Sequence, residues 1–229
     1  MYLLEASDRR WPERLRNMGE DMPASLWVHG GEDLRTITDR SVAIVGSRAA
    51  TAYGRTFAHS LASALAEDGW TVVSGGASGI DTAAHRGALA ARGRTVVSLP
   101  CGIARVHPPV NGDLFTEIAR TPGCALVSKY HPNDLPNRTR FLARDKVTVG
   151  LVLAVVVVEA AIHSGSMFTA RQALVYGRTL MAVPGPVTSA VSQGTNLLLA
   201  DSARPALSVE GVVDYLSMLA ALASYAEES

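Results

Sequence analysis

The sequence predicts an α/β protein built on a doubly wound, mostly parallel sheet with helices on both faces. Short β-branched runs alternate with amphipathic helical segments from Ser41 onward, and most of these runs end at Gly, Pro or Ser. The composition, 48% hydrophobic and 18% charged, is that of an ordinary globular protein. Both observations favour strands that lead through loops into helices.

The predicted elements follow one another in a regular order. The strands are residues 42–46, 71–74, 95–99, 125–129, 151–158 and 179–183, with a shorter candidate at 25–28. Helices are predicted at 53–68, 80–91, 114–120, 140–150 and 168–176, where apolar residues recur at helical spacing. We therefore divide the chain into a lead-in (1–40) packed on the core, a main domain (41–207) and a C-terminal helix (208–229).

The chain is neutral overall, but its charge is unevenly distributed. Residues 41–150 carry 12 basic and 7 acidic side chains, a net charge of +5. A basic stripe inside a neutral protein suits a polyanion bound in one groove, although surface charge often serves solvation alone.

The sequence also predicts where the protein works. Met1 is not followed by an apolar leader, and the most apolar run, 151–158, is far shorter than the roughly 20 residues of a membrane-spanning helix. The only cysteines, Cys101 and Cys124, form neither a disulfide framework nor a metal-ligand pattern. We expect a cytoplasmic protein without a membrane span.

Two loops that follow strands are predicted to bind anions. Gly46, Ser47 and Arg48 follow the first strand of the main domain, and a glycine-rich turn at 74–81 follows the second. The candidate residues of that turn are Gly75, Ser78 and Gly79. Neither a G-x-G-x-x-G fingerprint nor a Walker A loop is present, so a dinucleotide cofactor or ATP hydrolysis loses support.

A third candidate region mixes basic and aromatic side chains. Cations meet phosphates while rings stack on bases, which is typical of proteins that bind single strands. The alternative is a solvated helix face with the phenylalanine in the core. The candidate residues are Lys129, Arg140, Phe141, Arg144 and Lys146.

Further along the chain, Ser164, Gly165 and Ser166 form another turn suited to anions. Glu159 is a possible acid–base group, but a single carboxylate without an identified partner is weak support for an enzyme. Asp81 and His85 lie four residues apart without a third ligand. We predict no metal site, no cofactor and no catalytic residue.

Taken together and in order, these motifs resemble the DNA-processing protein A (Smf) family from about Trp11 to Ala206. The motifs that carry the resemblance are Gly46-Ser47-Arg48, Tyr53-Gly54, the turn at 74–81, Ala84-His85, the Asn111 loop, Val158-Glu159-Ala160, Ser164-Gly165-Ser166, Val183-Pro184-Gly185 and Gly194-Thr195-Asn196.

The resemblance implies an extended Rossmann-like fold and a homodimer. It also implies binding of single-stranded DNA without sequence preference, and presentation of that strand to a RecA-type recombinase during natural transformation. Carried over by motif, Arg48 grips a phosphate, the amides of Gly46, Ser47, Ser78 and Gly79 cradle others, and the helix at 141–146 lines the groove. Lys129 is an extension beyond the family's motifs.

The chain departs from the family's pattern at two points. Arg144-Asp145-Lys146 stands where the family usually has Arg-Asn-Arg, which places an acid in the expected groove and weakens the expected DNA contact. Because the sequence ends soon after the Rossmann-like part, we expect it to lack the winged-helix domain that many members carry.

Two other functions stay open on the same fold. Phosphoribohydrolases that cleave nucleoside monophosphates carry Pro-Gly-Gly-x-Gly-Thr, but residues 161–166 read Ala-Ile-His-Ser-Gly-Ser here. A nucleotide-sensing module would hold a small ligand in a closed pocket over Gly46 and Gly79.

Overall fold

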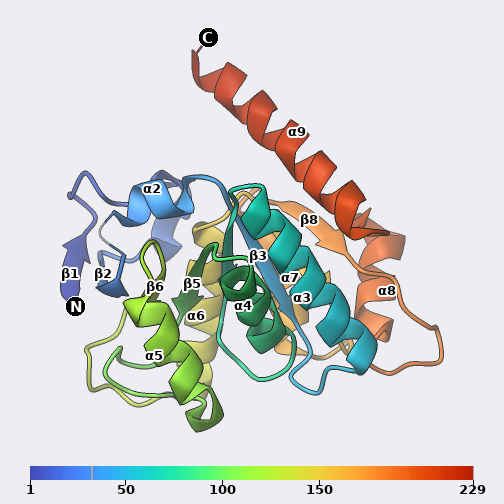
Figure 1. Ribbon diagram of the computed structural model, residues 1–229, viewed down its shortest axis with the longest axis horizontal. Coiled ribbons are helices and arrows are strands. Elements are labelled where there is room, and N and C mark those ends of the chain that lie inside the picture. Colours follow the sequence, from blue (N-terminus) through green and yellow to red (C-terminus); the bar gives the residue numbers. More distant parts are fainter. Residues whose placement is uncertain (32, 229) are drawn as a thin grey trace.

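A nine-stranded sheet forms the centre of the protein in the computed structural model, which describes residues 1–31 and 33–228 (Figure 1). Its strand order is β1-β2-β6-β5-β4-β3-β7-β8-β9. The strands from β6 to β9 are parallel, while β1 and β2 run antiparallel at one edge. Their bounds are β1 Tyr2–Glu5, β2 Ser25–Gly30, β3 Ser41–Gly46, β4 Thr71–Ser74, β5 Arg94–Ser98, β6 Ala125–Ser128, β7 Ala154–Val158, β8 Thr179–Ala182 and β9 Arg204–Pro205.

Helices cover both faces of this sheet, so the predicted fold class is confirmed. In β3, Val42 and Ile44 pack with residues of α3, α4 and α9, while Ala43 and Val45 point to the opposite face and pack with α6 and α7. The helices are α1 Glu13–Arg16, α2 Leu34–Asp39, α3 Ala52–Glu67, α4 Ile80–Ala90, α5 Gly112–Arg120, α6 Arg138–Gly150, α7 Gly165–Val175, α8 Gln193–Asp201 and α9 Val209–Glu228, with short 3₁₀ turns η1 Gly19–Asp21 and η2 Pro109–Asn111.

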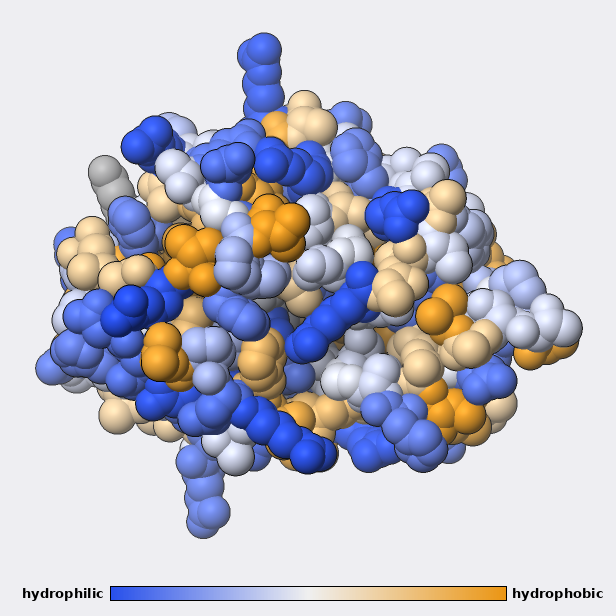
Figure 2. All heavy atoms as spheres, turned by 90° about the horizontal axis from the view of Figure 1, so that it is seen from below, coloured by the Kyte–Doolittle hydropathy of each residue, from blue (hydrophilic) through white to orange (hydrophobic). Residues whose placement is uncertain are grey.

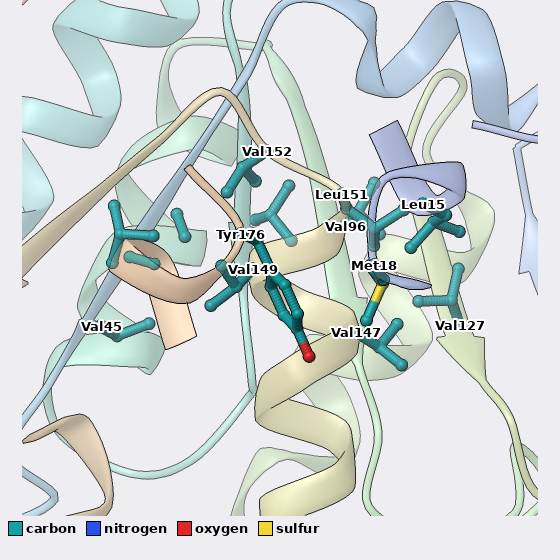
Figure 3. Packing of buried hydrophobic residues seen from close by; sticks show 14 of the residues in the cluster. Leu15, Met18, Val45, Val96, Val127, Val147, Val149, Leu151, Val152 and Tyr176 are labelled. Atoms are coloured by element: carbon teal, nitrogen blue, oxygen red, sulfur yellow. The ribbon is translucent and has the colours of Figure 1, made fainter. Parts of the chain in front are cut away.

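The N-terminal segment shares the core of the sheet. Leu15 and Met18 belong to the same buried cluster as Val127 and Val147 (Figure 3). Gly150 makes this packing possible, because a Cβ at that position would lie 2.2 Å from the sulfur of Met18.

The topology creates a crevice at the carboxyl ends of two central strands. From β3 the chain builds the sheet outward through β4 and β5 to β6, then returns to add β7 on the other side of β3. The loops after β3 and β7 therefore diverge to opposite faces, and open α/β sheets bind ligands at such a point.

The predicted strand at 151–158 is too long at its start. Residues 151–153 instead connect α6 to β7: the amides of Leu151 and Val152 donate to the carbonyls of Val147 and Val149 in the last turn of the helix, and the amide of Leu153 donates to the carbonyl of Ser41. The apolar run is continuous because both the helix end and β7 are buried, and periodicity alone does not separate them. Among the described residues, the helices are too short or too polar to cross a bilayer.

Candidate nucleic-acid interface

A cavity of about 410 Å³ lies in the crevice between the ends of β3 and β7. The loops after β3, β4 and β7 and the helices α4, α6 and α7 supply its walls. The lining residues from the predicted set are Gly46, Ser47, Arg48, Gly75, Arg144, Ser164, Gly165 and Ser166, and the wall also includes Asp81, Asp145 and Thr169. The anion-binding loops predicted from separate parts of the sequence thus meet in one place.

A second hollow of about 210 Å³ adjoins the first and shares Arg48, Gly75, Ala77 and Arg144 with it. Its other walls are Ser78, Pro100, His107, Pro108 and Phe141. Viewed from below, the face of the molecule shows hydrophilic side chains in and around a central depression (Figure 2). A polar cavity therefore continues into a hollow with an aromatic wall.

The loop after β3 is fixed by backbone bonds to its neighbours. The amide of Ser47 donates to the carbonyl of Glu159 at 2.8 Å, and the amide of Ile80 donates to the carbonyl of Ser47 at 3.1 Å. This contradicts the expectation that the Ser47 amide cradles a phosphate, because the carbonyl of Glu159, just after β7, already accepts from that donor. Ser47 lines the cavity as part of a rigid loop.

Glu159 holds the entry to α3. Its φ is +55°, and its carboxylate accepts hydrogen bonds from the amide (2.8 Å) and the hydroxyl of Thr51. The side chain packs against Gly54, where a Cβ would lie 2.4 Å from a carboxylate oxygen. The residue is 4% exposed, and its contacts assign it to loop structure.

The glycine-rich turn after β4 is held from two sides. Asn111 donates to the carbonyl of Gly76 at 2.8 Å, and the carboxylate of Asp81 accepts from the amide of Ala77 at 3.2 Å. Gly79 has φ +82°, and a Cβ there would lie 2.3 Å from the carbonyl of Ser47. The two loops that are predicted to bind anions consequently touch, and Gly79 is the position of closest approach.

Asp81 and His85 are both buried, and each has a partner within the protein. Burial raises the pKa of Asp81 against the opposing effect of Arg144. His85 Nδ1 lies 2.7 Å from the hydroxyl of Thr95, and burial lowers the pKa of His85 to about 3, so the ring is neutral. In the described ranges, three His, Cys, Asp or Glu side chains do not gather as a metal site would need.

Arg144 lies deep in the wall between the two hollows. Its side chain is 6% exposed and lies directly over Gly75, where a Cβ would be 1.1 Å from a guanidinium nitrogen. Nη1 is 4.0 Å from Asp81, and Nε is 3.0 Å from Asp145 without hydrogen-bond alignment. Only glycine at position 75 leaves room for this guanidinium.

Arg48 lies at the open side of the same wall. It is exposed, and its guanidinium carbon is 5.1 Å from the centroid of the Phe141 ring. The ring of His107 meets Phe141 edge-on at 5.5 Å. Phe141 is only partly buried and faces the smaller hollow, which agrees with the binding interpretation and not with a core position.

The structure does not bring three of the predicted cations to the cavity. Lys146 pairs with Asp21 of η1 at 2.6 Å, and Lys129 is exposed near Asp21, where it helps to lower that carboxyl's pKa. Arg140 pairs with Asp134 at 3.0 Å and lies over the ring of Tyr130. Residues two apart on a helix point in different directions, so the spacing of Lys146 from Arg144 already argued against a shared face.

Sequence reasoning missed His107 and left Thr169 out of the candidate site residues, although it places Thr169 on the helix after the turn at 164–166. His107 stands in the proline-containing loop before η2, and nothing in its local pattern marks it. Thr169 lies one turn into α7, on the face that carries Gly165 and Ser166 into the cavity. Helical spacing from Gly165 would have found Thr169 once the start of α7 was placed correctly.

Similar proteins of known structure share this fold closely. The DNA processing protein A (DprA) of Streptococcus pneumoniae superposes with a TM-score of 0.86 at 32% identity, over 93% of this chain and 73% of that one. The same protein from Helicobacter pylori, described for its single-stranded DNA binding mode, gives a TM-score of 0.84 at 30% identity, over 95% of each chain.

Sequence comparison identifies the same group. A protein of Mycobacterium tuberculosis named for DNA processing (DprA) is 39% identical over 232 residues, which cover 96% of this chain and 59% of that protein. The chain thus spans about three-fifths of that relative's length. The family model for DNA recombination-mediator protein A matches residues 2–217. This chain belongs to the DNA recombination-mediator protein A family.

Proposed function

We propose that the protein binds single-stranded DNA along the two adjoining hollows, without sequence preference. The observation that carries this proposal is the position of Arg48, which borders the polar cavity and also lies over the aromatic ring of the smaller hollow. One nucleotide can therefore place its phosphate against the guanidinium of Arg48 and its base against the ring of Phe141. Bases in a duplex are stacked on each other, so this arrangement favours a single strand.

The absence of sequence preference follows from the kind of groups that line the hollows. Guanidinium groups, backbone and hydroxyls contact phosphates, which are the same in every nucleotide, and ring stacking accepts any base. The DNA-binding relative from Helicobacter pylori supports the assignment of substrate.

Three further parts of the proposal rest on family membership. We expect a homodimer, a cytoplasmic location, and delivery of the bound strand to a RecA-type recombinase during DNA uptake and recombination. Light scattering after size exclusion tests the dimer, and recombinase filament formation on strands coated by a single-strand-binding protein tests the delivery.

We also propose that the protein is not a nucleotide hydrolase. The carboxylate of Glu159 is bound to Thr51 and borders a different hollow, with Tyr53 and Pro184, outside the 410 Å³ cavity. Incubation with nucleoside 5′-monophosphates is expected to release no free base by chromatography, and base release that Glu159→Gln abolishes would contradict this.

Fluorescence anisotropy of a labelled oligo-dT at two salt concentrations, with unlabelled duplex as competitor, tests strand binding. We expect binding that weakens steeply with salt, because displaced counterions drive the association, and little competition from duplex. Equal competition by duplex, or no binding at low salt, would refute the proposal.

Replacing Phe141 by leucine is expected to weaken oligo-dT binding about fivefold, near the lower end of the roughly 1–3 kcal/mol that stacking contributes per base. The change keeps an apolar side chain but removes the ring face. Leu142→Ala is the matched control, because Leu142 is the next residue of α6 and is 40% exposed. The same titration measures both variants, and equal effects would argue against a stacked base.

A further inference from the structure

The polar cavity contains as many carboxylates as cations, which is unusual for a site that takes a polyanion. Arg48 and Arg144 line it together with Asp81 and Asp145. With all four groups ionised, their formal charges cancel. In that charge state, a phosphate that enters this cavity meets two negative charges as well as two positive ones.

Asp145 occupies the part of the cavity where an incoming anion is best stabilised. Its side chain is 14% exposed, and Oδ1 lies 3.0 Å from Nε of Arg144. A Cβ built on Gly165 would be 4.0 Å from Oδ2, so the carboxylate lies against the amino end of α7, a helix of 11 residues. The amino end of a helix attracts anions, and at α7 the carboxylate of Asp145 already lies at this position.

The hydroxyl of Ser164 also indicates that an anion binds at the amino end of α7. Ser164 precedes α7 and lines the cavity, and its hydroxyl oxygen is buried without a partner among the described residues. Buried polar groups are normally hydrogen-bonded, so this hydroxyl is positioned to donate to an anion at the helix end. Asp145 lines the same cavity from α6.

We propose that Asp145 is a built-in competitor of the bound phosphate, so that strand binding is coupled to uptake of a proton by this carboxyl group. This inference rests on the proposed binding of single-stranded DNA and names the residue that sets its affinity. When Asp145 is neutral, the positive charges of Arg48 and Arg144 are both available to the strand. When Asp145 is ionised, it pairs with Arg144 and offsets the charge of that arginine.

The surroundings of Asp145 shift the protonation of its carboxyl group toward neutral pH. Burial raises its pKa to about 6 and the charge of Asp81 on α4 raises it too, while Arg144, Arg48 and the hydroxyl of Thr169 on α7 oppose the shift. The carboxyl is mainly protonated at pH 5 and ionised at pH 8. Because the bound phosphate favours the protonated form, affinity falls as the pH rises through about 6.

The effects of two other titratable groups near the site have to be distinguished from the effect of Asp145. Burial, Arg48 and Arg144 lower the pKa of His107 from its ordinary value, so this ring is neutral above that value. Asp81 has a raised pKa and remains in every variant below. Any pH dependence that survives replacement of Asp145 therefore reports His107 or Asp81.

Anisotropy of oligo-dT carrying a pH-insensitive dye, from pH 5.5 to 8 at constant salt, tests the coupling with the full chain. Wild-type affinity is expected to fall about tenfold over this range, which corresponds to a pKa of Asp145 that is about one unit higher with the strand bound than without it. Asp145→Asn is expected to bind about tenfold tighter than wild type at pH 8 and to show a nearly flat profile. Asp201→Asn, the same charge change at an exposed position that ends α8, is expected to follow wild type.

The outcomes separate this inference from the proposed function. Wild type that binds the strand with the same pH profile as Asp145→Asn would overturn the role of Asp145 and leave strand binding intact. Failure of all variants to bind oligo-dT at any pH would overturn both. Circular dichroism checks folding, and Asp145→Ser provides a second neutral side chain if the asparagine variant is unfolded.

Discussion

Replacing Arg48 by alanine is expected to weaken binding of single-stranded DNA by about 10- to 100-fold, corresponding to the roughly 1.5–3 kcal/mol of a hydrogen bond to a charged group. Arg48 borders both hollows and lies over the ring of Phe141, so its loss removes a phosphate contact and one support of the stacking position. Arg48 is exposed in the loop that follows β3, and we expect the fold to survive the change.

The salt dependence gives this prediction a second readout. Loss of one phosphate contact is expected to reduce the slope of log affinity against log salt by about 1. Arg92→Ala is the matched control, because this exposed arginine precedes β5 and so lies near the amino ends of the parallel strands, away from the crevice at their carboxyl ends. Comparable losses in the two variants would mean that general charge, and not the crevice, holds the strand.

Replacing Gly46 by alanine is expected to destabilise the fold by about 3 kcal/mol or more, at or above the usual upper end for overpacking a close-packed interior. A Cβ on Gly46 would lie 1.8 Å from the carbonyl oxygen of Val158, and backbone cannot rotate away as a side chain can. β3 and β7 would have to separate at the pair that forms the floor of the crevice.

Urea denaturation followed by circular dichroism measures this effect. Gly112→Ala is the control, because Gly112 has helical backbone angles and a Cβ there would lie 3.4 Å from a side-chain carbon of Val106, near ordinary contact. We expect Gly112→Ala to stay within about 1 kcal/mol of wild type, the size of a glycine-to-alanine propensity change. A Gly46→Ala protein as stable as wild type would show that the two strands are not packed as described.

The sequence alone predicts the sheet and the cavity loops because both depend on local signals. Glycines at 46, 75 and 79 mark close approaches of backbone or side chain, and each follows a β-branched run. The edges of the sheet are harder to predict. β1 has four residues and β9 has two, and pairing with a neighbour rather than propensity makes them strands.

The cations near the crevice were only partly predictable for a different reason. Arg144 and Lys146 are close in sequence, yet one is buried over Gly75 while the other pairs with Asp21, 125 residues away. An uneven charge distribution in a sequence suits a bound polyanion but does not tell which cations face it. That choice depends on long-range packing of η1 against α6, which no local pattern encodes.

Photocrosslinking of an oligo-dT that carries 5-iodouracil, followed by mass spectrometry of the crosslinked peptides, tests the central claim most directly. The account predicts crosslinks to Phe141 or His107 in the smaller hollow, and their loss in Phe141→Leu where the ring is the acceptor. Crosslinks confined to the amino ends of the parallel strands, around Arg92, would contradict a single strand bound in the crevice between β3 and β7.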